Sequence, residues 1–343
     1  VVYDNAEKLG PMAAEESRMG SEQDKIAKCR NKSALIWESL KDKKSCDIIN
    51  RIEERRMIEV AKPVGVVASI IPSTNPVVTP MSNGAFALKC RNSVIFAPHP
   101  RAVKCTKLLV EMFRAELKKL GLPEDLVLGL EEVSNDLTSE LMSAADMVVA
   151  TGGMGMVKAA YSSGKPAIGV GQGNVQCIID EDADIADAVG KIIIGRAFDN
   201  GLICLGEQTV FVPEDKEAEF VAEMKKQGGY LVEGEENVDK LREGLFPGGG
   251  AFSRVVVGMF ADQVSDEIGL GAPKGTRVLF AKAKALGAGD VLCREKLCPV
   301  IAYMTYKTFK EGVAMMEANL EHEGKGHSIA VHSNTPENVE YAA

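Results

Sequence analysis

The chain has 343 residues, 45% of them apolar, and a formal charge of −9. This length allows two domains at roughly 100–200 residues each. The acidic balance and the lack of a long basic run argue against nucleic acid, because nucleic-acid binding relies on Lys and Arg that neutralise phosphates. We therefore expect a folded globular protein with a small-molecule partner.

No apolar stretch reaches the ~20 residues of a membrane helix, because "VGVVASIIPSTNPVVTP" is broken by Pro72, Asn75 and Pro76. The eight cysteines are scattered, and the close pair Cys293 and Cys298 has neither zinc-finger spacing nor nearby histidines. We expect no membrane span, no metal, and free thiols in a reducing cytoplasm. The chain starts without Met, and both end segments read as interrupted helices, so we expect further residues at each end.

From residue 60 onward, short β-rich runs alternate with helical runs. Strands are predicted at 64–72, 93–98, 126–131 and 147–151, with helices at 77–90, 102–121 and 138–145. The second half restarts with a strand at 175–180, a helix at 183–198, a turn at 199–201, a strand at 209–212, a helix at 216–228, a Gly-rich loop at 246–253 and a strand at 277–281. This alternation predicts an α/β fold with parallel sheets covered by helices, and we place the domain boundary near residue 172.

Loops that follow strands are the first places to look, because ligands bind beyond the carboxyl ends of the strands in parallel sheets. In "IPSTNP" (71–76), Asn75 stands between two prolines, where it is either an aimed amide or a plain turn residue. In "ATGGMGMV" (150–157), Gly152 and Gly153 allow a phosphate or a nicotinamide to approach a helix start. The spacing is not GxGxxG, so a tight turn explains these glycines nearly as well.

Cys204 is the third candidate, and we group its loop with the other two. It follows a helical run and the turn-forming Asp199-Asn200-Gly201, a setting that no other cysteine of the chain has. Free cysteines are usually small buried hydrophobes. The residues alone therefore leave two interpretations open, a packing residue or a nucleophile.

Six segments together resemble the aldehyde dehydrogenase superfamily, in its coenzyme A-acylating branch. They are "PSTNP", "FAPHPRA", "ATGGMGMVKAAYSSGKPAIGVGQGN", "FDNGLICLGEQ", "EKLCPV" and "GKGHS", in the order and spacing of that family from about residue 60 to the last residue. The resemblance implies an NAD(P)-binding domain over 1–171 and a catalytic cysteine domain over 172–343 that is cut short at its C-terminus. It also implies a homodimer or higher homo-oligomer.

The resemblance assigns roles by position. It implies that Cys204 is the nucleophile, that Asn75 supplies the side chain of the oxyanion hole, and that Glu295 holds the nicotinamide ribose. His327 is a candidate for the acyl or CoA pocket, with a structural histidine as the alternative. The residues expected to bind NADP or NAD are Pro72, Ser73, Thr74, His99, Pro100, Arg101, Gly152, Gly153, Gly171 and Glu295.

One departure from the family pattern indicates the fate of the thioester. Hydrolytic relatives carry a glutamate that activates water, whereas the matching stretch here, "IGVGQGN" (168–174), has no carboxylate. Without a general base, water attacks slowly and a thiol such as coenzyme A becomes the acyl acceptor. We therefore expect coenzyme A as a co-substrate and succinate semialdehyde as the aldehyde, with acetaldehyde or sulfoacetaldehyde as alternatives.

Cofactor choice stays open. Arg101 or Lys104 is a candidate to bind a 2′-phosphate, which favours NADP, although relatives with similar "PHPRA" stretches use NAD. Two other interpretations of the chain are a non-catalytic dinucleotide-binding or structural protein and a hydrolytic dehydrogenase with a base elsewhere. The presence of Cys204, Asn75 and Glu295 together speaks against a non-catalytic protein.

Overall fold

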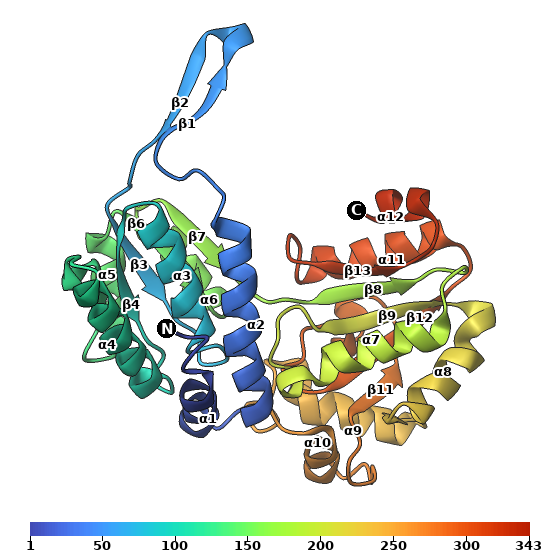
Figure 1. The fold of residues 1–343 in the computed structure, drawn as a ribbon. Helices are drawn as coiled ribbons and strands as arrows, with labels where there is room; N and C mark the ends of the chain where they lie inside the picture. The colour runs from blue at the N-terminus through green and yellow to red at the C-terminus, as the bar shows by residue number, and fades with distance from the viewer. The chain divides into compact units, whose positions relative to one another are not determined.

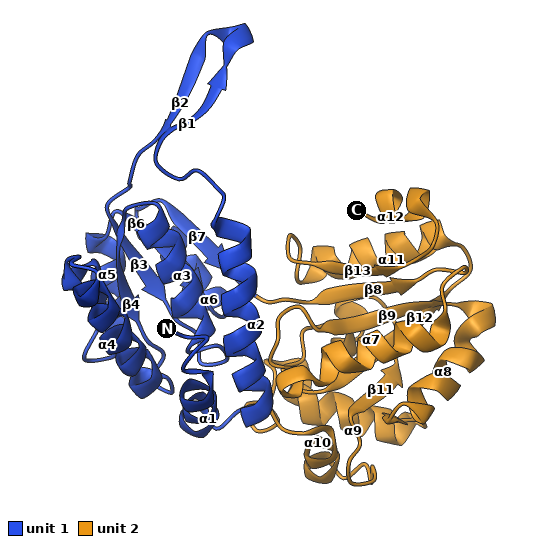
Figure 2. Ribbon diagram, viewed as in Figure 1, with its two compact units in different colours: residues 1–171 blue, residues 172–343 orange.

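The computed structural model describes residues 1–343, which form two compact units, Val1–Gly171 and Gln172–Ala343 (Figure 2). Each unit has its own parallel sheet with helices on both faces, so the predicted α/β class is confirmed. None of the helices combines the length and the apolar character that crossing a membrane requires.

The first unit is built on a five-stranded parallel sheet in the order β5-β4-β3-β6-β7 (Figure 1). Its strands are β3 (Val66–Ile70), β4 (Ser93–Ala97), β5 (Val127–Gly129), β6 (Met147–Thr151) and β7 (Ala167–Val170). The chain enters this sheet at the central strand β3, moves outward through β4 to β5, and then returns to the other side of β3 with β6. This reversal between β3 and β6 is a topological switch point, where ligands bind in open parallel sheets.

Helices cover both faces of this sheet, because successive strand residues point to opposite faces. On β3, Val67 packs with the helices α3 (Val78–Lys89) and α4 (Val103–Lys119), whereas Ala68 packs with α5 (Asn135–Ala144) and α6 (Met154–Tyr161). The helices α1 (Ala6–Ser17) and α2 (Glu22–Leu40) pack in turn against α3 and α4, with Leu9 fully buried among them.

A separate antiparallel hairpin, β1 (Asp47–Ile52) and β2 (Met57–Ala61), joins α2 to β3 (Figure 1). It forms a two-stranded sheet of its own. Apolar side chains on both strands are exposed, among them Ile58 at 52% and Val60 at 48%. The sequence patterns did not predict this hairpin.

The second unit holds a six-stranded parallel sheet in the order β10-β11-β12-β9-β8-β13. Its strands are β8 (Val175–Ile179), β9 (Glu207–Pro213), β10 (Gly229–Leu231), β11 (Val278–Lys282), β12 (Val300–Tyr306) and β13 (Ile329–His332). Its helices are α7 (Ile185–Ala197), α8 (Glu217–Lys226), α9 (Glu235–Leu245), α10 (Ala261–Ile268), α11 (Phe309–His322) and α12 (Pro336–Ala342). Helices α7 and α8 pack on one face, and α9 and α10 pack on a second core with β11 and β12.

The predicted strands and helices are present, with ends that differ by a few residues. The strand predicted over 64–72 shortens to Val66–Ile70, because Gly65 turns the chain with a φ of 122° and Pro72 lies in the following loop. Strand β7 was not predicted, since its sequence "AIGV" lies within a glycine-rich segment.

Candidate active site

The candidates of the first unit all lie at the carboxyl edge of its sheet. Pro72 to Asn75 follow β3, His99 to Arg101 follow β4, Gly152 and Gly153 follow β6, and Gly171 follows β7. Parallel strands present their carboxyl ends at one edge, so the sheet brings these loops to the same side. The loops after β3 and β6 flank the switch point.

Asn75 is half-buried at the end of the loop after β3, and its side chain is fixed on one side. Its Oδ1 accepts a hydrogen bond from Lys28 Nζ at 2.9 Å, and its Nδ2 lies 3.3 Å from Thr74 Oγ1. Its backbone carbonyl accepts from Thr79 N at 3.2 Å, which ties the loop to α3. Lys28 lies on α2, and the sequence patterns did not point to it.

The loop after β4 contains an exposed His99, Pro100 and Arg101. His99 Nδ1 accepts from the Arg101 backbone N–H at 3.1 Å. Partial burial of the ring, and to a smaller extent the Arg101 charge, lowers the pKa of the imidazole. The start of α4 beyond this loop is capped by Glu16, whose two carboxylate oxygens accept from Lys104 N at 2.7 Å and Cys105 N at 2.8 Å. A carboxylate therefore already occupies this helix N-terminus, a feature that sequence reasoning missed.

The second of the two glycines after β6, Gly153, leaves open space at the start of α6. Gly153 is the N-cap residue with φ −64°, and a Cβ built there would meet nothing within 4 Å. Neither backbone conformation nor packing within the protein requires glycine at this position. The open space beside the helix N-terminus fits a close ligand such as a dinucleotide.

The candidates of the second unit lie at the opposite, amino edge of their sheet. Cys204 precedes β9, Glu295 precedes β12 and His327 precedes β13, and Gly173, which was not among the predicted site residues, precedes β8 at the same edge. The Cys204 loop connects α7 to β9, as the predicted helix and strand around it imply, so grouping it with the two loops that follow strands was wrong.

Cys204 is exposed in the turn that leads into β9. The turn is set by three consecutive residues in the left-handed region, Asp199 (φ 48°), Asn200 (φ 53°) and Gly201 (φ 74°). Such a conformation costs non-glycine residues of order 1–3 kcal/mol each and persists only where the surroundings enforce it. Here Asn200 is buried and its Nδ2 donates to Gly258 O at 2.9 Å, which anchors the turn.

Glu295 is connected to the Cys204 turn through Gly173. The Glu295 side chain accepts from Gly173 N at 2.8 Å, and a Cβ at position 173 would lie 2.4 Å from the Cys204 carbonyl oxygen. Only glycine lets these two segments approach so closely. Burial raises the pKa of the Glu295 carboxyl, although the Gly173 hydrogen bond opposes that rise.

Two fully buried cations lie behind this edge, and sequence reasoning missed both. Lys296 Nζ donates to Leu292 O at 2.6 Å and to Arg294 O at 2.7 Å, and Arg196 donates to the carbonyls of Lys296 and Cys298. Burial, reinforced by the Arg196 charge, lowers the pKa of Lys296 to about 7. Lys296 stands directly before the apolar run "LCPVIAY" (297–303), and this position is the only signal that the sequence offered.

His327 is half-buried in the loop before β13, and burial lowers the pKa of its imidazole. That loop begins at Glu323, whose carbonyl accepts from Asn174 Nδ2 at 3.1 Å. Since Asn174 directly follows Gly173, the hydrogen bond attaches the start of the His327 loop to the same edge as Glu295. His327 Nδ1 itself is buried and has no hydrogen-bond partner.

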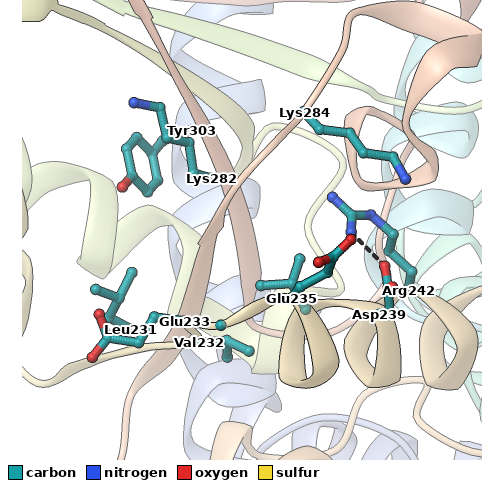
Figure 3. Close-up of a pocket in the computed structure, with 11 residues that line it drawn as sticks. Leu231, Val232, Glu233, Glu235, Asp239, Arg242, Lys282, Lys284 and Tyr303 are labelled. Atoms are coloured by element: carbon teal, nitrogen blue, oxygen red, sulfur yellow. Dashed lines mark hydrogen bonds and ion pairs between the residues drawn. The ribbon is translucent and has the colours of Figure 1, made fainter.

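A cavity of about 390 Å³ lies at the carboxyl edge of the same sheet, away from these residues (Figure 3). Leu231 ends β10 and Lys282 ends β11, and both line it. Its charged residues are mixed in sign, with Arg242 paired to Asp239. None of the predicted site residues lines this cavity, so in this unit the predicted residues do not lie at the edge that the usual rule for parallel sheets selects.

Comparison with known proteins identifies the family. The aldehyde dehydrogenase family profile matches residues 8–240. The chain is 48% identical over 342 residues to the succinate-semialdehyde dehydrogenase (acetylating) of Clostridium kluyveri, covering 100% of this chain and 75% of that protein. It is 39% identical over 342 residues to the sulfoacetaldehyde dehydrogenase (acylating) of Bilophila wadsworthia, covering 98% and 74%. The solved acetylating aldehyde dehydrogenase of Geobacillus thermoglucosidasius has a TM-score of 0.94 at 37% identity, covering 100% and 76%.

The chain therefore belongs to the aldehyde dehydrogenase family. Within that family it is a CoA-acylating aldehyde dehydrogenase, an oxidoreductase that acts on aldehydes. The resemblance drawn from the sequence motifs is confirmed.

Proposed function

We propose that this protein oxidises succinate semialdehyde to succinyl-CoA, with NADP or NAD as hydride acceptor and coenzyme A as acyl acceptor. The observation that carries the substrate is the 48% identity over 342 residues to an enzyme named for it. Sulfoacetaldehyde is the second candidate, because a relative at 39% identity is named for that aldehyde. Acetaldehyde is a third.

Cys204 is the proposed nucleophile. Its thiolate forms a bond to the aldehyde carbon, and the carbonyl becomes an oxyanion that accepts hydrogen bonds from Asn75 Nδ2 and the Cys204 backbone N–H. One such donor is typically worth ~3 kcal/mol in the transition state. When the oxyanion collapses, the C=O bond re-forms, the hydride leaves and the acyl group stays on Cys204 as a thioester. The bound nicotinamide supplies the hydride acceptor.

The packing around the glycine segment supports transfer to coenzyme A over hydrolysis. A Cβ at position 169 would lie 2.7 Å from Val157 Cγ1, and one at position 171 would lie 2.9 Å from Met154 Sδ. Side chains of α6 therefore leave little room for a side chain at positions 169 and 171. Without a general base there, the thioester waits for the CoA thiolate, which bonds to the acyl carbon and releases the Cys204 thiolate.

The first unit supplies the proposed cofactor site. The open start of α6 at Gly152 and Gly153 suits the close approach of a dinucleotide, and the loop that contains Pro72, Ser73 and Thr74 lies across the switch point from it. Arg101 is exposed and is the proposed partner of a 2′-phosphate in NADP. Glu295, in the second unit, is the proposed ribose ligand.

We also propose a homo-oligomer in the cytoplasm. The exposed apolar residues of the β1–β2 hairpin support assembly, because an isolated two-stranded hairpin is marginal in water. The eight cysteines are all free, which suits a reducing compartment.

The test is NAD(P)H production from succinate semialdehyde by the full-length protein, with and without coenzyme A. We expect turnover only with CoA, and none from Cys204→Ala. Cys90→Ala is the matched control, since Cys90 is also exposed but lies in the first unit at the end of α3. Turnover that does not need CoA would indicate a hydrolytic enzyme, and full activity of Cys204→Ala would remove its role.

A further inference from the structure

Lys28 is a buried cation that contacts a proposed catalytic side chain. It lies on α2 with 4% of its surface exposed, and its Nζ donates to Asn75 Oδ1 at 2.9 Å. Lysines are almost never this buried, because removing an ammonium group from water is costly unless it is paired or hydrogen-bonded. The contact spans 47 residues of sequence, so it is a product of the tertiary fold.

The ammonium group determines which way the Asn75 amide faces. An ammonium carries donors only, whereas a side-chain amide has an oxygen that accepts and a nitrogen that donates. The atom of Asn75 that faces Lys28 is therefore Oδ1, and Nδ2 faces away from α2. A flipped amide would place two donors against each other.

A second lysine holds the backbone of the same loop. Lys25 is 3% exposed, and its Nζ lies 3.4 Å from the Thr74 carbonyl oxygen. Lys25 and Lys28 are three residues apart on α2, so they share one face of the helix. The loop residue Thr74 and its neighbour Asn75 thus each contact one ammonium group.

We propose that Lys28 is a positioning residue for the oxidation step, which rests on the oxyanion role of Asn75 proposed above. Its ammonium group holds Oδ1, so that Nδ2 is kept as the donor that the loop presents to the oxyanion. The positive charge also withdraws electron density from the amide through Oδ1, which strengthens the Nδ2 hydrogen bond. Lys28 itself touches neither substrate nor cofactor in this proposal.

The experiment compares four single variants of the full-length protein and one double variant. Lys28→Met removes both charge and donor, and Lys28→Gln removes the charge but keeps a donor for Oδ1. Lys32→Met removes a charge from the next turn of α2 and is the control. Asn75→Ala and the double variant Lys28→Met with Asn75→Ala complete a double-mutant cycle. The readouts are kcat for NAD(P)H formation, the dissociation constant of NADP, and Tm.

We expect Lys28→Met to lower kcat roughly 10- to 100-fold, less than the 10²–10³-fold cost of removing an oxyanion donor outright. Lys28→Gln should recover part of this loss, and NADP affinity should be unchanged. In the Asn75→Ala background, Lys28→Met should lower kcat by less than about threefold, because the group it positions is already absent.

Two results would overturn the inference. The first is that Lys28→Met lowers kcat by the same factor in the Asn75→Ala protein as in the unmodified protein. The second is that the kcat of Lys28→Met equals that of Lys32→Met. If Lys28→Met does not fold, Lys28→Gln in the same cycle gives the decision. Failure of the proposed function is distinct, since it would already appear in the unmodified protein as the absence of CoA-dependent NAD(P)H formation from the aldehyde.

Discussion

Lys296 shows how a single buried charge can hold the segment that contains a proposed site residue, Glu295. Its ammonium group is held by the carbonyls of Leu292 and Arg294, and its backbone N–H donates to Gln208 Oε1 at 2.9 Å. These bonds fix the segment just before β12, which also contains Glu295. Burial of the ammonium group and its proximity to the Arg196 charge oppose these stabilising contacts. Both effects disfavour the charged form, and they lower the pKa to about 7.

The stability of the protein should therefore depend on pH through Lys296. The pKa of the lysine side chain is 10.5 in the unfolded chain and about 7 in the folded protein, so between these two pH values the unfolded state binds more protons. The free energy of unfolding should then rise with pH across this window. Lys296→Met removes that contribution, so its stability relative to the unmodified protein should fall by up to ~1.4 kcal/mol per pH unit between pH 7 and 10.

Urea unfolding at pH 7, 8 and 9 measures this difference directly. Lys62→Met, at an exposed loop position, is the control for removing a lysine as such. If the difference in unfolding free energy between Lys296→Met and the unmodified protein stays constant from pH 7 to 9, the pKa of Lys296 is not lowered in the folded protein.

Residues such as Lys28 and Lys296 also mark the limit of what the sequence predicts. The turn "DNG" and the motifs around it pointed to Cys204, because left-handed turns favour Asp, Asn and Gly. Lys28 and Lys296 carry no comparable pattern. The partner of Lys28 is the amide oxygen of Asn75, which is distant in sequence, and Lys296 bonds to backbone carbonyls of the preceding turn, which any sequence supplies. Their burial becomes evident only once the helices and strands have packed.

At the scale of elements, apolar runs predicted most of the buried strands, because a strand covered on both faces reads as a continuous apolar segment. The same reasoning missed β1 and β2, whose apolar residues are exposed. It also grouped the Cys204 loop with loops that follow strands. The alternation of helix and strand defines the order of elements along the chain, but it does not say at which edge of a sheet the functional residues lie.

The hairpin yields a prediction about assembly. Ile58 and Val60 lie on the same side of β2, because side chains alternate along a strand, and both are about half exposed. Replacing both with Lys should shift the full-length protein toward smaller species by removing apolar contact area, with the sedimentation coefficient as the measurement. Glu59→Lys changes a residue that points to the other side of the strand and should sediment as the unmodified protein does. An unchanged distribution for the double variant would remove the hairpin from the interface.

At the scale of the whole molecule, the proposed cofactor-binding residues other than Glu295 belong to the first unit, whereas the proposed nucleophile belongs to the second. The loops of the first unit lie at the carboxyl edge of their sheet, and those of the second unit lie at the amino edge of theirs. The proposed cofactor binding therefore depends mainly on the first unit, and the proposed thiol chemistry depends on the second. A substitution at the proposed nucleophile should therefore leave cofactor binding measurable.

Ligand-linked thermal unfolding tests this separation together with the cofactor preference. A ligand that binds only the folded state stabilises it by about 2.7 kcal/mol at a hundredfold excess over its dissociation constant, so NADP or NAD should raise Tm. Cys204→Ala should keep the full rise in Tm, because it removes only the thiol.

Arg101→Ala should lower the rise in Tm given by NADP more than that given by NAD, since a guanidinium pairs with the 2′-phosphate that only NADP carries. An equal effect of Arg101→Ala on both cofactors would exclude that contact, and loss of the rise in Cys204→Ala would mean that the thiol contributes to cofactor binding itself.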